Sequence, residues 1–182
     1  YPPFRSELRT TVELRDAAMI VELGHFALVL ALVVAAVQMV LPAWGARRRD
    51  GRLMSVAEPA AMAQLLLLIL AFAALTHAYV VSDFSVQNVA ANSHSTKPLI
   101  YKISGVWGNH EGSMLLWVLI LALFGAAVAA FGNNLPATLK ANVLAVQASI
   151  ALAFLLFLVT TSDPFIRPDP APADGNGLTP IP

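Results

Sequence analysis

The chain has 182 residues, of which 58% are hydrophobic and only 12% are charged. Soluble domains carry roughly 25% charged residues, so this composition indicates an integral membrane protein. The formal net charge is zero and no long basic stripe is present, which argues against nucleic acid as a partner. The sequence contains no cysteine, which excludes disulfides, thiolate metal sites and a cysteine nucleophile within it.

Four apolar runs are each long enough to cross a bilayer as a helix, which takes about 20 residues. They cover residues 22–41, 59–81, 112–131 and 142–160. Pro42 is expected to end the first run, Pro59 suits a first helical turn, and Gly132 opens the turn that closes the third run. The sequence therefore predicts an all-α, polytopic membrane protein with about four transmembrane helices.

Residues 1–18 are much more polar than the run that follows Met19, and they are set aside as doubtful leader or upstream sequence. The membrane part is then residues 19–182. The first and third loops hold five basic residues, against three in the second loop and the tail. By the positive-inside rule, the outer loop (residues 82–111) and the Pro-rich tail (161–182) face away from the cytoplasm. Counting the arginines of residues 1–18 would reverse this bias.

A polar, aromatic and glycine-rich motif opens the third run: Trp107-Gly108-Asn109-His110-Glu111-Gly112-Ser113. Ionisable groups beside a membrane helix are costly to bury without partners, so they mark a candidate functional site. The simpler interpretation is a helix start at the lipid–water interface. Asn109 or Ser113 would cap the helix, Glu111 would complement the helix dipole, and Trp107 would anchor the interface. Local chemistry alone favours this simpler interpretation.

The histidines and three glutamines, in the apolar runs and in the outer loop, also fall at two depths. Four histidines lie on the expected outer side: His25, His77, His94 and His110. For each of them a hydrogen-bonded interfacial role is more common than metal ligation. Three glutamines share one depth near the opposite surface: Gln38, Gln64 and Gln147. We expect them to hydrogen-bond between the first, second and fourth helices, each bond adding roughly 0.6 to 2 kcal/mol.

The outer loop is long for a plain connector, and loops of that size usually carry a function. Lys97, Tyr101 and Lys102 within it could hold a flat apolar ligand that carries carboxylates, with the aromatic ring against its face and the ammonium groups on its acids. They could equally meet phospholipid headgroups. The Pro-spaced tail should be extended, without helix, until a turn at residues 174–177, and suits a surface strap between membrane helices.

Four stretches in this order resemble the beginning of the CcmF family, the large membrane subunits of bacterial cytochrome c maturation. They are Glu22-Leu23-Gly24-His25; Asp83-Phe84-Ser85-Val86 with residues 89–93; residues 107–117; and Thr161-Ser162-Asp163-Pro164-Phe165 with Asp174-Gly175. Trp-Gly-x-His-Glu-Gly-Ser followed by Leu-Leu-Trp is the specific part. A nitrite-reductase-associated relative of CcmF shares much of this pattern. The chain departs from the usual pattern at residue 163, where Ser-Asn-Pro is usual, and at residues 178–181, where Leu-Asn-Pro-Leu is usual.

The resemblance implies a subunit of a cytochrome c heme lyase in the bacterial inner membrane. Similar proteins join heme from a heme chaperone to reduced apocytochrome c through thioether bonds on the outer face. The implied partners are the heme chaperone, apocytochrome c, other cytochrome c maturation membrane subunits and the lipid bilayer. Heme is the implied cofactor, but no histidine here matches a known axial position of the family. The axial ligands are therefore expected outside this chain, which alone should be inactive.

The candidate heme-handling residues are Trp107, Gly108, His110, Glu111, Lys97 and Lys102, with no catalytic residue and no metal ligand assigned. Glu111 is expected to be structural because a carboxylate repels heme propionates, whereas the two lysines are better propionate partners. One alternative is an ion or solute transporter subunit, which would predict ionisable residues or broken helices at mid-membrane. The other is a non-catalytic scaffold of the maturation complex.

Overall fold

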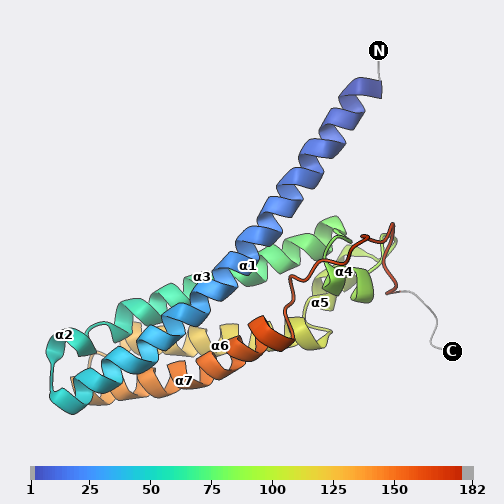
Figure 1. The fold of residues 1–182 in the computed structure, drawn as a ribbon. Coiled ribbons are helices and arrows are strands. Elements are labelled where there is room, and N and C mark those ends of the chain that lie inside the picture. The colour runs from blue at the N-terminus through green and yellow to red at the C-terminus, as the bar shows by residue number, and fades with distance from the viewer. Residues whose placement is uncertain (1–2, 178–182) are drawn as a thin grey trace.

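The computed structural model describes residues 3–177, and for residues 3–18 it describes the helical backbone alone. Four long helices form a bundle: α1 (Pro3–Arg48), α3 (Ala57–Val81), α6 (His110–Phe131) and α7 (Ala137–Thr161). All four are long and apolar enough to cross a membrane, α1 from Met19 onward. The described residues contain helices and loops but no strand, which confirms the predicted all-α polytopic fold. Figure 1 shows that the N-terminal part of α1 projects beyond the other helices.

The bundle packs through small residues on its inside. Helix α1 contacts both α3 and α7, and α6 contacts the same two helices. The buried faces repeat alanine at helical spacing, at 27, 31 and 35 of α1 and at 71, 74 and 78 of α3. Small side chains let helix backbones approach closely, which is how helices associate where lipid removes the hydrophobic drive between them. Large apolar side chains such as Trp117 and Phe124 point outward instead, as lipid contact allows.

The first helix does not end at Pro42; that prediction was wrong, because α1 continues to Arg48. Proline removes one backbone hydrogen bond, but membrane helices tolerate this loss, and residues 43–46 continue the apolar run. The helix ends where Arg49 adopts a left-handed φ of 55°.

The other three long helices begin earlier than predicted, at Ala57, His110 and Ala137, because their first turns extend into polar sequence. Their ends at Val81, Phe131 and Thr161 lie within one residue of the predicted ends.

The glutamine layer forms only in part. Gln38 Nε2 of α1 donates to the Leu144 carbonyl of α7 at 3.2 Å, as expected between the first and fourth helices. Gln147 instead donates to the Leu121 carbonyl of α6. Gln64 is buried, but its Nε2 has no hydrogen-bond partner among the described residues. The predicted bonding of the first, second and fourth helices is therefore correct for Gln38 and wrong for the other two.

Short helices lie at both ends of the bundle. Helix α2 (Gly51–Met54) follows α1 at one end, and α4 (Gln87–Asn92) and α5 (Leu99–Gly105) lie at the other end, in the long loop between α3 and α6. The tail, residues 162–177, contains no helix and runs beside α4 (Figure 1). Residues 82–109 and 162–177 are called the polar cap below. The departure from the usual family pattern at residues 178–181 lies outside the described residues.

The tail is bonded to α4 and to the residue that follows it through the backbone. The Gln87 amide donates to the Ile166 carbonyl at 2.8 Å, and the Asn176 amide donates to the Ala90 carbonyl at 2.7 Å. The Gly177 amide donates to the Ser93 carbonyl at 3.0 Å. These contacts give the tail the strap-like path that its proline spacing suggested.

A polar cap above a membrane bundle

Helix α6 begins with a complete cap. The Asn109 side chain accepts a hydrogen bond from the Gly112 amide at 2.8 Å, so Asn109 is the N-cap and satisfies one of the free amides of the first turn. Ser113 instead donates to the His110 carbonyl at 2.9 Å. A Cβ on Gly112 would lie 1.6 Å from the Val106 carbonyl oxygen, so only glycine lets the α5–α6 turn fold against this helix.

The cap residue also belongs to a buried polar network that links α3, α4 and α6. The Tyr79 hydroxyl, fully buried, donates to Asn88 Oδ1 at 2.5 Å. Asn109 Nδ2 donates to the same hydroxyl at 3.0 Å. Asn88 Nδ2 lies within bonding distance of Asn109 Oδ1, at 2.9 Å, and of Glu111 Oε2, at 3.1 Å. The buried side chains of this network, Tyr79 and Asn88, thus have partners, and the network fixes α4 against the start of α6.

Three of the four histidines contact the tail. His110 Nδ1 lies 3.0 Å from Ser162 Oγ, and the His110 ring packs edge-on against Phe157, with ring centroids 6.1 Å apart. His25 Nε2 lies 3.5 Å from an Asp163 oxygen. His94 Nε2 lies 3.5 Å from an oxygen of Asp174. These three histidines therefore join the tail to the bundle and loop, as the hydrogen-bonded interpretation expected. For His77 that expectation was wrong, because its buried Nδ1 has no hydrogen-bond partner among the described residues.

The far end of the tail is held to the loop by one carboxylate. The Ser95 hydroxyl donates to Asp174 Oδ2 at 2.6 Å, and the Ser95 amide donates to Oδ1 at 3.0 Å. The Ser95 hydroxyl, helped by the Gly175 amide, holds the pKa of Asp174 below its ordinary value of 3.8. The charged form of Asp174 is therefore the form that closes the tail onto the loop.

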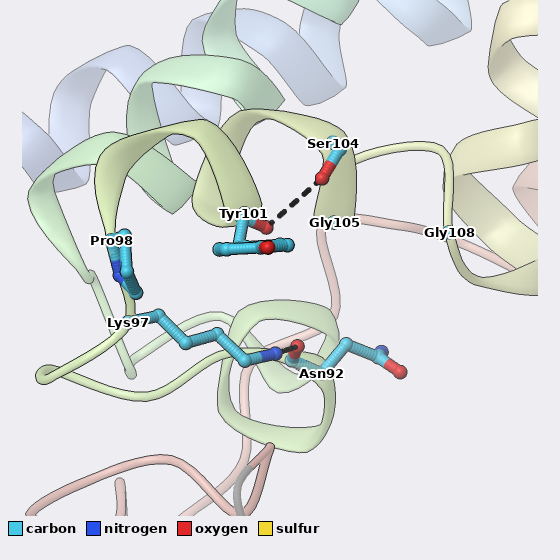
Figure 2. A pocket seen from close by; sticks show the side chains of 7 residues that line it. All are labelled: Asn92, Lys97, Pro98, Tyr101, Ser104, Gly105 and Gly108. Atoms are coloured by element: carbon cyan, nitrogen blue, oxygen red, sulfur yellow. Dashed lines mark hydrogen bonds between the residues drawn. The ribbon is translucent and has the colours of Figure 1, made fainter.

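A cavity of about 540 Å³ opens between α4, α5 and the turn before α6 (Figure 2). Lys97 lies along one wall and donates from Nζ to the Asn92 carbonyl at 2.8 Å. The Tyr101 ring covers the opposite side, with 62% of the residue exposed. Gly108 lines the end toward α6. The cavity combines an aromatic face with an ammonium group, the combination expected for a flat apolar ligand that carries an acid.

The six candidate residues divide into separate places. Lys97 and Gly108 line the cavity. Lys102 does not line it and donates from Nζ to Ser82 Oγ at 2.6 Å. Trp107 is 44% exposed on the turn before α6. His110 contacts the tail and Glu111 joins the buried network, as described above.

Sequence reasoning missed Tyr79 and Asn88, which hold the network together. Two signals point to them. Tyr79 is a hydroxyl-bearing residue at the end of an apolar run, and Asn88 and Asn92 lie one helical turn apart in the loop. Neither signal reveals that Tyr79 and Asn88 meet, because that contact depends on how α4 folds back over α3.

Four helices long and apolar enough to span a membrane, with a hydrogen-bonded polar cap at one end, define a polytopic membrane protein. A family model described as "Cytochrome C assembly protein" matches residues 107–178, which include the motif at the start of α6 and the tail. The chain is 64% identical to the cytochrome c-type biogenesis protein CycK of Rhizobium meliloti, over 90% of this chain and 24% of that protein. It is 53% identical to the cytochrome c-type biogenesis protein CcmF of Pseudomonas aeruginosa, over 90% of this chain and 25% of that protein.

A solved structure entitled "Cytochrome c Heme Lyase CcmF" superposes with a TM-score of 0.76 and 30% identity, covering 80% of this chain and 24% of that one. The predicted resemblance to CcmF is confirmed: this chain is similar over 90% of its length to the CcmF and CycK proteins of cytochrome c biogenesis. It spans about a quarter of the length of those relatives.

Proposed function

We propose that this chain serves cytochrome c maturation as part of a heme lyase subunit, which handles heme and promotes its covalent attachment to apocytochrome c. The similarity to cytochrome c biogenesis proteins over 90% of the chain supports the process. The observation that supports a heme-handling role for this segment is the cavity on the polar cap, which Lys97 and Tyr101 both line. The polar cap is proposed to lie on the periplasmic side of the bacterial inner membrane, where apocytochrome c is met.

Heme, as the substrate, is a flat apolar ring with two carboxylates, and the residues of the cap suit both parts. An ammonium group has three donors, and Lys97 uses one of them on the Asn92 carbonyl. Lys102 likewise uses one donor on the hydroxyl of Ser82. Both lysines keep donors for the substrate carboxylates. Tyr101 and Trp107, both exposed, offer aromatic faces to the ring.

The remaining candidate residues are proposed to position the cap. Glu111 accepts from the buried Asn88, so it maintains the network and its charge is kept away from a propionate. His110 contacts Ser162 and so aligns the tail with α6. No iron ligand is assigned to this chain, and the axial ligands are proposed to come from the remainder of the protein. The heme chaperone, apocytochrome c and other maturation membrane subunits are the proposed partners.

The test uses the full-length protein, with cytochrome c yield and copurified heme as separate measurements. We expect Lys97→Gln with Lys102→Gln to lower both, and Trp107→Ala or His110→Ala to lower the yield. Arg167→Gln is the matched control, because Arg167 is a cap cation that already has the carboxylate of Glu22 at 3.1 Å. Unchanged yield and unchanged heme in the lysine variant would refute the role of the cavity. Lower yield with unchanged heme would indicate a scaffold instead.

A further inference from the structure

The end of the bundle opposite the polar cap carries a dense cationic patch. Four arginines lie within six residues of one another, where α1 ends and α2 begins, and all are exposed: Arg47, Arg48, Arg49 and Arg52. They are called the basic corner below. In Figure 1 this corner is the turn beside the label of α2, at the end of the bundle far from the tail.

The basic corner is not neutralised within the described residues. None of its arginines takes part in any of the ion pairs found there. The two nearby carboxylates have other partners: Asp50 caps α2 by accepting from the Arg52 amide at 2.9 Å, and Glu58 accepts from Lys140 at 2.7 Å. Five cations, the four arginines and Lys140, thus face two carboxylates, Asp50 and Glu58, which leaves a net charge of +3 at this end.

The cations at the polar cap behave differently, because each has a partner in the protein. Lys97 and Lys102 donate to neutral oxygens of Asn92 and Ser82, and Arg167 meets Glu22. The basic corner therefore differs from the rest of the described chain: its charge is concentrated and its guanidinium groups are left for an external anion.

The corner lies at the end of the apolar span of α1, which is where lipid headgroups are expected, and its turn is tightly packed. The apolar span of α1 ends there, and Trp44, 48% exposed, is an interfacial anchor. The Arg48 guanidinium carbon lies 4.7 Å from the centroid of the Trp44 ring. A Cβ on Gly45 would lie 2.6 Å from Leu53 Cβ, so this glycine lets α2 pack tightly against α1.

Arg49 supplies an independent indication that the side chains matter. It occupies the left-handed region with φ of 55°, directly after the last residue of α1. That position is most often glycine, and a residue with a side chain is strained there by roughly 1 to 3 kcal/mol. Glycine would relieve this strain but would remove one of the four guanidinium groups, so the arginine at this position maintains the charge of the corner at a cost to the backbone.

We propose that the basic corner binds anionic phospholipid, with the arginines donating paired hydrogen bonds to headgroup phosphates. Guanidinium groups match the geometry of phosphate oxygens, and a cluster of them at the end of a membrane helix attracts lipids of net negative charge. This binding anchors the end of α1 and the turn into α2 independently of any chemistry at the polar cap. Removing arginines weakens the preference by roughly fivefold for each residue.

The experiment compares lipids retained by the full-length protein. The protein is reconstituted in nanodiscs of equal parts phosphatidylglycerol and phosphatidylcholine, and the lipids that stay bound on release are counted by native mass spectrometry. The wild type is expected to retain phosphatidylglycerol preferentially, and Arg48→Gln with Arg49→Gln and Arg52→Gln to lose the preference. Arg48→Lys with Arg49→Lys and Arg52→Lys keeps the charge, and so the membrane orientation, and should keep most of the preference for phosphatidylglycerol. Arg167→Gln, at the opposite end, should match the wild type.

A single substitution separates lipid binding from folding. Arg49→Gly removes one guanidinium but relieves the backbone strain, so the protein should unfold no more easily while its preference for phosphatidylglycerol falls roughly fivefold. Equal retention of both lipids by the wild type would overturn the proposal. So would full retention of the preference by the triple glutamine variant, or displacement of the lipid by inorganic phosphate at matched ionic strength.

Discussion

Asn109→Ala is the substitution that most directly tests the role of the network in the polar cap. The Asn109 side chain accepts from the Gly112 amide at 2.8 Å and from Asn88 at 2.9 Å. It donates to the Tyr79 hydroxyl at 3.0 Å and to the Gly105 carbonyl at 2.9 Å. Alanine removes the cap of α6 and its links to α3, α4 and α5 in one step.

The expected cost follows from these contacts. Loss of an N-cap asparagine costs about 1 kcal/mol. The bonds to Tyr79 and Asn88 contribute about 1 kcal/mol each in a buried site, because their partners have no water to replace Asn109. The sum is about 3 kcal/mol, which makes opening of the first turn of α6 roughly a hundredfold more frequent.

Hydrogen–deuterium exchange on the full-length protein measures this opening directly at the amides of residues 110–113. Ser113→Ala is the matched control, because its hydroxyl bonds only to the His110 carbonyl of its own turn, and exchange there should change less than about threefold. In a double-mutant cycle with Tyr79→Phe, the coupling to Asn109 should be about 1 kcal/mol. The reasoning is refuted if Asn109→Ala exchanges no faster than Ser113→Ala.

Three further predictions concern packing, the glutamine layer and pH. Gly112→Ala should destabilise the start of α6 by about 3 kcal/mol, measured by hydrogen–deuterium exchange at residues 110–113. Gly108→Ala should be nearly neutral in that measurement, because its added Cβ would meet nothing closer than 3.4 Å. Gln38→Leu should lower unfolding stability in detergent by roughly 0.6 to 2 kcal/mol, while Gln64→Leu should leave it unchanged or raise it, because its buried amide nitrogen has no partner. The contact of Asp174 with the loop should be intact at neutral pH, because the charged carboxylate is the form that is bonded. It should be lost only when pH falls below 3.8 and passes the lowered pKa of Asp174. Hydrogen–deuterium exchange of residues 93–96 across pH, compared with Asp174→Asn, measures this loss.

The membrane part was predictable because the bilayer leaves few choices. Each apolar run of about 20 residues has to be a helix, since lipid offers no partner for backbone groups. The cap of α6 was predictable for a similar reason, because Asn109 stands directly before a helical run. Pro42 misled the prediction because the rule that proline ends a helix comes from helices in water. In water the broken turn can be solvated, and the chain can leave the helix.

The polar network was out of reach because its bonds join residues distant in sequence. Tyr79 reaches Asn88 over nine residues, and Asn88 reaches Glu111 over 23. Such contacts depend on the path of α4 and α5, which are six and seven residues long and show no clear period. The cavity was foreseen only as an association of Lys97, Tyr101 and Lys102, and of these Lys102 does not line it. The place of Gly108 in the cavity follows from the fold of the loop.

The paired cations can be ranked as binding groups for an anion by the kind of partner that each already has. Lys140 and Arg167 face carboxylates at 2.7 and 3.1 Å, so an incoming acid would compete with a charge already in place. Lys97 and Lys102 are held by a carbonyl and a hydroxyl, which orient the ammonium group without cancelling its charge. Holding a side chain in advance also reduces the entropy lost when a ligand binds. Geometry thus favours these two lysines over the other paired cations as partners for carboxylates at the polar cap.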